Sequence, residues 1–529
     1  MRPEVLALKT LLRSVVLIGI WAIGVVAIVG SGGGGSEPQP PSHSGQFLSL
    51  RSGGSDGASY YAAIGATGDT FESFKARNGF EPVQAPDLSA SAAYFNAGDL
   101  NLGRDMHCLP NTTGLACYVS NHAQIANGNV VFSDDATAAL TGLTNGETPF
   151  ATVAMEYAAP TTIGPTNVVV RECDGVPTPP AQKDSCGGET RPGFAEGEIR
   201  SPASGLDRDS GIDVQPGDVL TITATGTMDT GFFFQTTNGP NGYANIDNDP
   251  KFPLHPSFPF ALLGRVGSNA YFLIGQALAT TYTGSAGRLF LRANDDTPGN
   301  GWGHFDVSVT VQRAATARFY VYDGAGVLQT QAALDSEGKK NVPGICLACH
   351  GGTYNTVTHT VSGASFLPFN LKSFKYSSAS GLSRAAQEQS FRRLNAMVKS
   401  TRPAGFDPIS DFIDGMYQPQ TVNTPGAIAR DDYVPAGWSG NPNLYNGVIR
   451  PYCTGCHLAL GPSRDLDFTS LSQVLAKKAN GSLQPLVCST RSMPHSEVAF
   501  NHFWTDDGGS WPAYVERPDT LGLTGCTAP

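Results

Sequence analysis

Charged residues are scarce in this 529-residue chain, at 15% of the total, and the basic ones are the scarcer kind. The sequence has 34 Lys and Arg against 45 Asp and Glu, which gives a formal net charge of -11. Because proteins that bind nucleic acid neutralise phosphates with a surplus of Lys and Arg, this balance argues against a nucleic-acid partner. The sequence also contains neither a P-loop nor a Rossmann glycine fingerprint, so no motif indicates nucleotide chemistry.

Glycine and proline, in contrast, are abundant, with 62 and 37 copies. Hydrophobic residues make up 40% of the chain, an ordinary share for a globular protein. The length allows two to four domains, each with its own core. The many turn-forming residues favour β-rich modules with long connections over helical bundles.

The N-terminus has the pattern of an export signal. Three basic residues precede an apolar run over residues 15–29, and a Gly/Ser/Pro linker follows over residues 31–45. The run predicts that residues 1–30 are a signal peptide or a retained membrane anchor. We therefore expect an exported protein, located in the periplasm, on the outer surface or in the medium. Bacterial lipoproteins begin similarly, but Ser31 stands where their acylated cysteine would be, so no lipid anchor is expected.

The sequence Cys-x-x-Cys-His occurs twice, in "VPGICLACHGG" and in "PYCTGCHLALG". Its residues are Cys346, Cys349 and His350 in the first copy and Cys453, Cys456 and His457 in the second. With 10 Cys and 10 His in 529 residues, chance alone gives on the order of 0.004 copies. Cysteines at i and i+3 share one face of a helical turn, where both sulfurs can bond the same haem while the adjacent histidine ligates its iron.

On these motifs the chain resembles the c-type cytochromes. The resemblance implies two covalently bound haem c groups, with His350 and His457 as iron ligands. The alternative is zinc, because paired CxxC motifs also build zinc ribbons. The two motifs begin 107 residues apart, whereas a ribbon separates its pairs by about 15–20 residues, and each motif carries its own histidine. The pattern therefore favours haem.

The opposite iron ligand of the second haem is predicted to be Met493. It is followed by Pro494 and lies some tens of residues after the motif, as the methionine of small monohaem cytochromes does. His495 and His502 are the competing ligands. Methionine opposite histidine raises the reduction potential, which suits reversible one-electron transfer.

The first haem has no such clear partner. Met416, Met106 and His107 are candidates, and an open coordination position is the remaining alternative. Met397 lies in an apolar stripe at helical spacing, so we expect it in a core. His359 follows His350 by only nine residues, which makes the opposite haem face hard to reach.

Six cysteines remain outside the motifs, and an even number in an exported chain indicates disulfides. Six cysteines allow fifteen connectivities, and free buried thiols are the alternative. Short loop closures favour Cys108–Cys117 and Cys173–Cys186, which leaves Cys488–Cys526 as the third pair.

Strand-like and helix-like segments alternate along the chain in four blocks. Residues 46–190 read as the first part of a β-rich host domain, and residues 314–440 as its second part, which carries the first haem site. Residues 195–313 read as an inserted antiparallel β-sandwich, and residues 441–529 as a cytochrome c-like unit with the second haem site. The predicted fold is multidomain: a β-rich N-terminal region with this insert, followed by mainly α-helical cytochrome c-like haem domains.

The insert resembles the small calcium-dependent galactose-binding lectins of the PA-IL type, on segments such as "GIDVQPGDVLTITATGTM" and "GRLFLRANDDTPGNGWGHFDVSVTVQ". The resemblance implies a calcium site in which Asn294–Asp295 match the family's Asn-Asp pair and Asn300 its first carboxamide. Gly301 stands where another carboxamide is expected, which weakens the match. Asp296, Asp247 and Asp249 supply further oxygen donors of the kind that calcium prefers. An ordinary polar turn is the alternative.

Together these features predict an exported dihaem c-type cytochrome that carries out one-electron transfer and is positioned by a carbohydrate-binding-like module. Its expected partners are a redox protein of the periplasm or cell exterior and, for the module, a carbohydrate. One alternative is a dihaem peroxidase-like enzyme, in which one iron keeps an open position. Another is a surface carbohydrate-binding protein. The sequence does not decide whether the chain is an enzyme.

Overall fold

The computed structural model describes a large part of the chain. Its described residues are 43, 47–48, 54–82, 88–126, 129–131, 140–143, 145, 147–171, 207–230, 236–296, 302–403, 405–460, 466–504, 521–523 and 526. The predicted signal segment and the Cys173–Cys186 pair lie outside these residues. Within them, every helix is too short or too polar to cross a bilayer.

The centre of the main body is a seven-stranded antiparallel sheet with the order β1-β2-β3-β6-β16-β20-β19. Its strands are β1 Ala90–Phe95, β2 Gly103–Pro110, β3 Gly114–His122, β6 Ala151–Ala158, β16 Thr316–Asp323, β19 Gly351–Tyr354 and β20 Val361–Ala364. Two small hairpins accompany it, β4 Gln124–Ala126 with β5 Asn129–Val131, and β17 Gln331–Ala332 with β18 Lys340–Asn341. Buried and half-buried residues alternate along β6, as expected for a strand covered on both faces.

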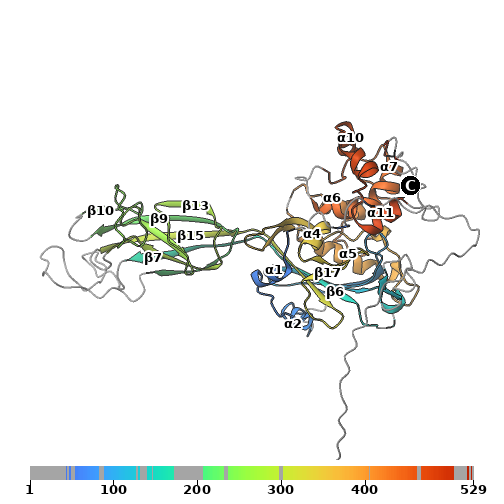
Figure 1. Cartoon of the computed structure of the whole chain (residues 1–529), viewed down its shortest axis with the longest axis horizontal. Helices are drawn as coiled ribbons and strands as arrows, with labels where there is room; N and C mark the ends of the chain where they lie inside the picture. The colour runs from blue at the N-terminus through green and yellow to red at the C-terminus, as the bar shows by residue number, and fades with distance from the viewer. Residues whose placement is uncertain are drawn as a thin grey trace, which may run out of the picture. The chain divides into compact units, whose positions relative to one another are not determined.

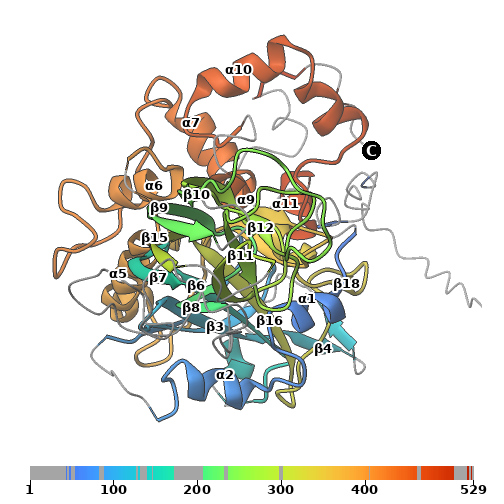
Figure 2. The ribbon, with the colours of Figure 1, turned by 90° about the vertical axis from the view of Figure 1, so that its left-hand side faces the viewer.

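The two faces of this sheet are covered by different parts of the chain. On one face, Phe74 of helix α2 (Phe71–Arg77) packs against the rings of Tyr320 and Tyr322 on β16. Side chains of the opposite face form cross-strand rows, among them Met106, Val119 and Val153. Helices of the C-terminal half lie on this second side of the sheet (Figures 1 and 2).

The chain leaves the sheet after β6, forms a β-sandwich, and returns with β16, which pairs directly with β6. One sandwich sheet contains β7 Thr161–Arg171, β9 Val219–Thr230, β10 Thr236–Asn238, β13 Ala277–Thr281 and β15 Trp302–Arg313. The other contains β8 Arg208–Val214, β11 Leu262–Val266, β12 Phe272–Leu273 and β14 Gly287–Ala293. Apolar residues of both sheets, such as Ile222 and Leu289, form a core of their own.

The sandwich therefore begins earlier than the sequence pattern indicates. Strand β7, which we expected in the host domain, pairs along its length with β15 of the sandwich. Its Val168–Val170 run identifies a strand, but the choice of partner depends on residues more than 130 positions away. The inserted module starts at Thr161 rather than at residue 195.

Helices dominate the chain after β16. The helices of the main body are α1 Gly57–Ala63, α2 Phe71–Arg77, α4 Gly344–His350, α5 Arg384–Ser400, α6 Pro408–Tyr417, α7 Pro442–Leu444, α8 Arg450–Tyr452, α9 Thr454–Leu460, α10 Leu471–Ala479 and α11 Glu497–Trp504. One 3-10 turn forms η2 Leu371–Ser373, and two π-helical turns form η3 Tyr445–Ile449 and η5 Pro485–Ser489. The protein is thus β-rich, with several antiparallel sheets and with helices in its C-terminal part.

One hydrophobic core joins the helices to the sheet. Phe319 of β16, Leu347 of α4 and Trp504 of α11 belong to the same buried cluster, and each is at most 2% exposed. The segment 441–529 therefore shares its core with the β-rich region, and a separate cytochrome-like helical domain is not confirmed.

Two of the predicted disulfides are confirmed. Cys108–Cys117 joins directly opposite residues of β2 and β3. Cys488–Cys526 ties Cys526 to η5, which contains Cys488. All four cysteines of the two CxxCH motifs are free thiols.

Candidate functional site

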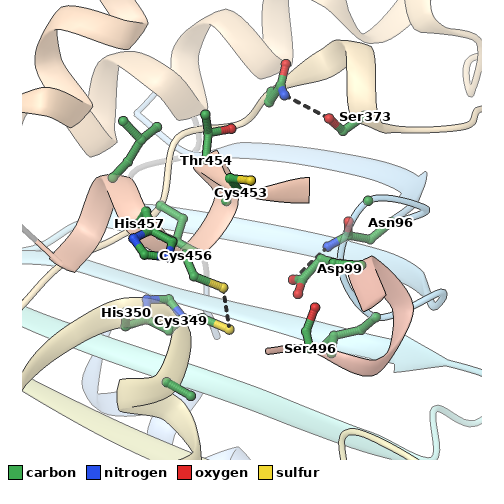
Figure 3. Close-up of a pocket in the computed structure, with 18 of the residues that line it drawn as sticks. Asn96, Asp99, Cys349, His350, Ser373, Cys453, Thr454, Cys456, His457 and Ser496 are labelled. Carbon is green, nitrogen blue, oxygen red and sulfur yellow. Dashed lines mark hydrogen bonds between the residues drawn. The ribbon is translucent and has the colours of Figure 1, made fainter. Parts of the chain in front are cut away.

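Both CxxCH motifs line the same cavity. It has a volume of about 370 Å³, and all seven residues predicted to hold haem contribute to its wall: Cys346, Cys349, His350, Cys453, Cys456, His457 and Met493. Sites for small organic molecules typically have volumes of about 300–1,000 Å³. Figure 3 shows Cys349 and His350 facing Cys456 and His457 across a short gap. The cavity therefore has the bulk required by a large organic cofactor.

The two motifs meet because their helices pack on each other. The first motif lies within α4, which begins after Pro343. The second motif starts between α8 and α9 and continues along α9, which contacts α4. The thiol of Cys456 donates to the Sγ of Cys349 at 3.5 Å (Figure 3).

Three of the motif thiols, those of Cys346, Cys349 and Cys453, have raised pKa values. Burial raises the pKa of Cys346 and of Cys453 to about 12. The hydrogen bond from Cys456, together with burial, raises the pKa of Cys349 well above its usual range. The thiols are thus held in the neutral form inside an apolar wall.

Each motif histidine is oriented by a backbone carbonyl. The Nδ1 of His350 lies 2.7 Å from the carbonyl oxygen of Ser365. The Nδ1 of His457 lies 2.7 Å from the carbonyl oxygen of Leu466. Since a carbonyl oxygen can only accept, Nδ1 carries the proton in both rings, and Nε2 is the nitrogen whose lone pair suits a metal. Burial also lowers the pKa of His350, which keeps its imidazole neutral.

The ion pair of Arg402 and Asp407 contacts Ser365, the residue whose carbonyl orients His350. Arg402 donates to the Oγ of Ser365, the residue whose carbonyl accepts from His350. The same guanidinium pairs with Asp407, with its Nε 3.1 and 3.0 Å from the two carboxylate oxygens. Asp407 in turn caps α6 by accepting from the backbone N–H of Ser410 at 2.9 Å. This chain of contacts fixes the position of the carbonyl that orients His350.

Two glycines follow His350 and allow the neighbouring chain segments to approach closely. Gly351 has a φ of +68°, and a Cβ on it would lie 2.2 Å from the carbonyl oxygen of Ala459 on α9. Gly352 has a φ of +80°, and its Cβ would lie 2.6 Å from the backbone nitrogen of Ala364. Only glycine meets both demands without strain.

The face of the sheet opposite α2 forms one wall of the cavity. Two methionines line it, Met106 on β2 and Met155 on β6. The sequence identified Met106 as a candidate iron ligand but missed Met155, which the alternation of β6 could have revealed. Arg104 and Asn121, directly opposite each other on β2 and β3, also line the cavity. The Nε of Arg104 and the Oδ1 of Asn121 are buried and make no hydrogen bond within the described structure.

The loop between η5 and α11 supplies a second wall. Met493, Pro494 and His495 from this loop all line the cavity. Burial, with a smaller contribution from nearby His43, lowers the pKa of His495 to about 4. His495 is therefore neutral at physiological pH and remains a competitor of Met493. His502 lies on α11 and is not among the residues that line the cavity.

The remaining candidates for the first haem lie elsewhere. Met416 is fully buried within the hydrophobic core. His107 pairs with Asp105 at 3.0 Å and stacks on a tyrosine. The Nδ1 of His359 shares a hydrogen bond with the hydroxyl of Tyr354 at 2.8 Å. None of the three lines the cavity, whereas Met106 does. Met397 packs in the core, as expected.

A buried cation also lines the cavity. Arg450 is 3% exposed, and it donates to the side-chain oxygen of Asn370 at 2.7 Å and to the carbonyl oxygen of Asp431 at 2.8 Å. The carboxylate of Asp431 pairs with Arg384 instead. Burial lowers the pKa of Arg450. A guanidinium with neutral acceptors in a cavity wall favours an anionic group, such as a haem propionate, within the cavity.

The calcium-related residues of the sandwich have mixed roles. Asn294 accepts from the backbone N–H of Leu254 and donates to the carbonyls of Leu254 and Phe258, each at 3.0 Å. Its amide therefore stabilises the loop 254–258 through these hydrogen bonds. Asp295 is 3% exposed, and Asn300 lies outside the described residues.

The other oxygen donors of the sandwich stabilise local turns. Asp247 accepts from the backbone N–H of Asp249, and Asp249 accepts from that of Lys251. In the part of the chain that the structure describes, no group of three or more His, Cys, Asp or Glu side chains is arranged to hold a bare metal ion. The calcium site stays a prediction, and the zinc alternative gains no support.

Comparisons with known proteins identify no family for this chain. No protein-family model matches the chain, and no curated protein matches it. Among solved structures, a lectin described as "EclA N-terminal domain; PllA-like lectin" matches with 21% sequence identity and a TM-score of 0.16. The match covers 20% of this chain and 86% of the lectin chain. It is a weak and partial structural match.

Proposed function

We propose that the protein is an exported dihaem c-type cytochrome that transfers electrons one at a time. The observation that carries this proposal is the pair of motif histidines in one cavity with four free cysteines, each histidine with its Nδ1 bonded to a backbone carbonyl, which makes Nε2 the nitrogen suited to iron. This arrangement matches the requirements of two thioether-linked haems.

The residues present fit the cofactor in three respects. The cysteines at i and i+3 of each motif can bond one porphyrin edge, while the cavity walls are built from apolar side chains such as Phe366, Leu483 and Phe503. Buried Arg450 offers a counter-charge for a propionate. When bound, haem c supplies an iron that cycles between its ferrous and ferric states. The chain orients the iron ligands and excludes water from the ring faces.

The proposal includes a location and partners. The leader sequence supports export, and covalent haem attachment belongs to the same compartments. A redox protein of the periplasm or cell exterior would deliver or accept the electrons. The β-sandwich would bind carbohydrate through calcium, with Asp295 and Asn300 as ligands, and so place the redox centre near its partner.

The test is the haem content of the full chain, exported in a host that matures c-type cytochromes. We expect the mass of two haems on the mature polypeptide, retained after denaturation, and an intense Soret absorbance. His457→Ala should change the Soret spectrum and the ligand state of one haem. The control is His107→Ala, at a candidate ligand that does not line the cavity. It should leave both the Soret spectrum and the ligand state of the haems unchanged. A mature protein without covalent porphyrin would refute the proposal.

A peroxidase-like enzyme is the second candidate function. It is favoured by one observation: a donor on Arg104 and an acceptor on Asn121 are buried in the cavity wall without a described partner. Bound hydrogen peroxide can use both, and its reduction to water takes two electrons from a reduced donor. If this function holds, cyanide will shift the ferric Soret band and peroxide will oxidise a reduced donor catalytically. Absence of both effects in the dihaem protein excludes it.

A further inference from the structure

The two cysteines that meet in the cavity belong to different motifs. Cys349 and Cys456 are 107 residues apart in sequence, yet their sulfurs are 3.5 Å apart. Both lie on helices that pack directly against each other. In each motif the second cysteine is a point at which the polypeptide bonds the edge of its porphyrin. The attachment points of the two haems are therefore adjacent.

We propose that the two haems form one electronically coupled pair, whose bonded edges meet at Cys349 and Cys456. This inference depends on the proposed function, because it requires both haems. With the sulfurs in contact, only the few bonds between each sulfur and its ring separate the two conjugated systems. One electron passes between the irons directly, so that one iron is oxidised as the other is reduced and no proton or further reactant is needed.

The chain is built to keep the two motifs in contact. Gly351 follows the iron-binding His350, and its missing side chain gives room to the carbonyl of Ala459, two residues after His457. A Cβ at that position would stand 2.2 Å from the carbonyl oxygen, far inside van der Waals contact. Gly455, between the cysteines of the second motif, has no neighbouring atom within 4 Å of such a Cβ. The glycine at the motif interface is thus required for the close approach, whereas the one inside the second motif is not.

The two motifs line one common cavity, as expected if their haems form a pair. The cavity wall contains Cys346 and Cys349 of the first motif together with Cys453 and Cys456 of the second. Buried Arg450, three residues before Cys453, lines this common space. Charge on one iron would therefore be felt by the other over a short distance within the protein, where screening is weaker than in bulk water.

The first experiment uses the mature full-length protein after its haem content has been measured. Circular dichroism across the Soret band should show a bisignate couplet, because two close transition dipoles mix. A potentiometric titration should show two one-electron steps, further apart than those of two independent, equivalent haems. Two covalent haems with a single-signed Soret band and steps that fit independent sites would overturn the inference while leaving the proposed function intact. Loss of covalent haem itself would refute the function.

A matched pair of variants tests the contact itself. Gly351→Ala should push α9 away from α4 and reduce the Soret couplet at least twofold while both haems remain attached. Gly455→Ala should leave the couplet at its original amplitude. An unchanged couplet in Gly351→Ala with full haem content would contradict the proposed geometry. If Gly351→Ala does not fold, the couplet and the two redox steps of the unmodified protein decide the matter.

Discussion

Replacement of Asp407 by Asn tests the ion pair behind the first motif. The Asp407 side chain is 4% exposed and that of Arg402 is 15% exposed. Removal of one member of a buried pair typically costs about 3–5 kcal/mol, because the other charge stays buried without compensation. Asn keeps an oxygen for the Ser410 N–H, and Arg402 retains some access to water, so we expect a loss of about 2–3 kcal/mol in the free energy of unfolding.

The pKa of Asp407 determines how the predicted loss of stability changes with pH. Burial by itself would raise the pKa of Asp407, but hydrogen bonds from Arg402 and Ser410 outweigh it and lower the pKa below its usual value. A carboxyl with a lowered pKa in the folded state stabilises the protein above its unfolded pKa, about 3.9, and this contribution disappears as the pH falls through the folded pKa. The difference between the original protein and Asp407→Asn should be complete at pH 7 and shrink below about pH 4.

The assay is guanidinium unfolding of the haem-loaded protein, followed by Soret absorbance and far-ultraviolet circular dichroism. Asp414→Asn is the control, since Asp414 lies on the same helix and pairs with Lys399 on the surface, with side chains 41% and 32% exposed. It should cost less than about 1 kcal/mol. Asp407→Asn should also shift the reduction potential of one haem, because Arg402 holds the residue that orients His350. A loss below about 0.5 kcal/mol at pH 7, or a loss that does not change in acid, would refute the reasoning.

Three other changes probe separate parts of the molecule. Cys108→Ser combined with Cys117→Ser removes a bridge across a sequence separation of 9 and should cost about 2–3 kcal/mol in denaturant unfolding; equal stability would show that the bridge contributes nothing. Met493→His should lower the midpoint potential of one haem in a potentiometric titration, whereas two unchanged midpoints would remove Met493 from the iron. Ile222→Ala opens a void in the sandwich core and should destabilise that module by about 2–5 kcal/mol in a thermal scan, with the Soret spectrum unaltered; a changed Soret spectrum would contradict the separation of the two cores.

The sequence was informative where chemistry imposes a local spacing. Two cysteines and a histidine within five residues identify each motif without any knowledge of the fold, and the structure places both motifs in one cavity. The Met-Pro pair after the second motif drew attention to Met493, which lines the same cavity; its role as an iron ligand stays a prediction. The alternating pattern of "ATVAMEYA" identified β6 correctly.

The rest depends on contacts between distant segments. Nothing in the spacing of the motifs indicates that Cys349 and Cys456 touch, because that contact results from the packing of α4 on α9. Ser365 and Arg402 are common residue types in unremarkable positions, and they become positioning groups only through the fold. Strand β7 was assigned to the wrong neighbour for the same reason, since a strand pattern does not specify its partner.

Strands β6 and β16 lie side by side with Ala158 directly opposite Thr316. The β-sandwich is therefore inserted between the end of β6 and the start of β16, which are neighbours in the sheet. Residues 159–315 could be excised and replaced by an Asn-Gly turn, which closes antiparallel neighbours at this spacing. The shortened chain would preserve every strand of the seven-stranded sheet, because none of these strands lies within residues 159–315.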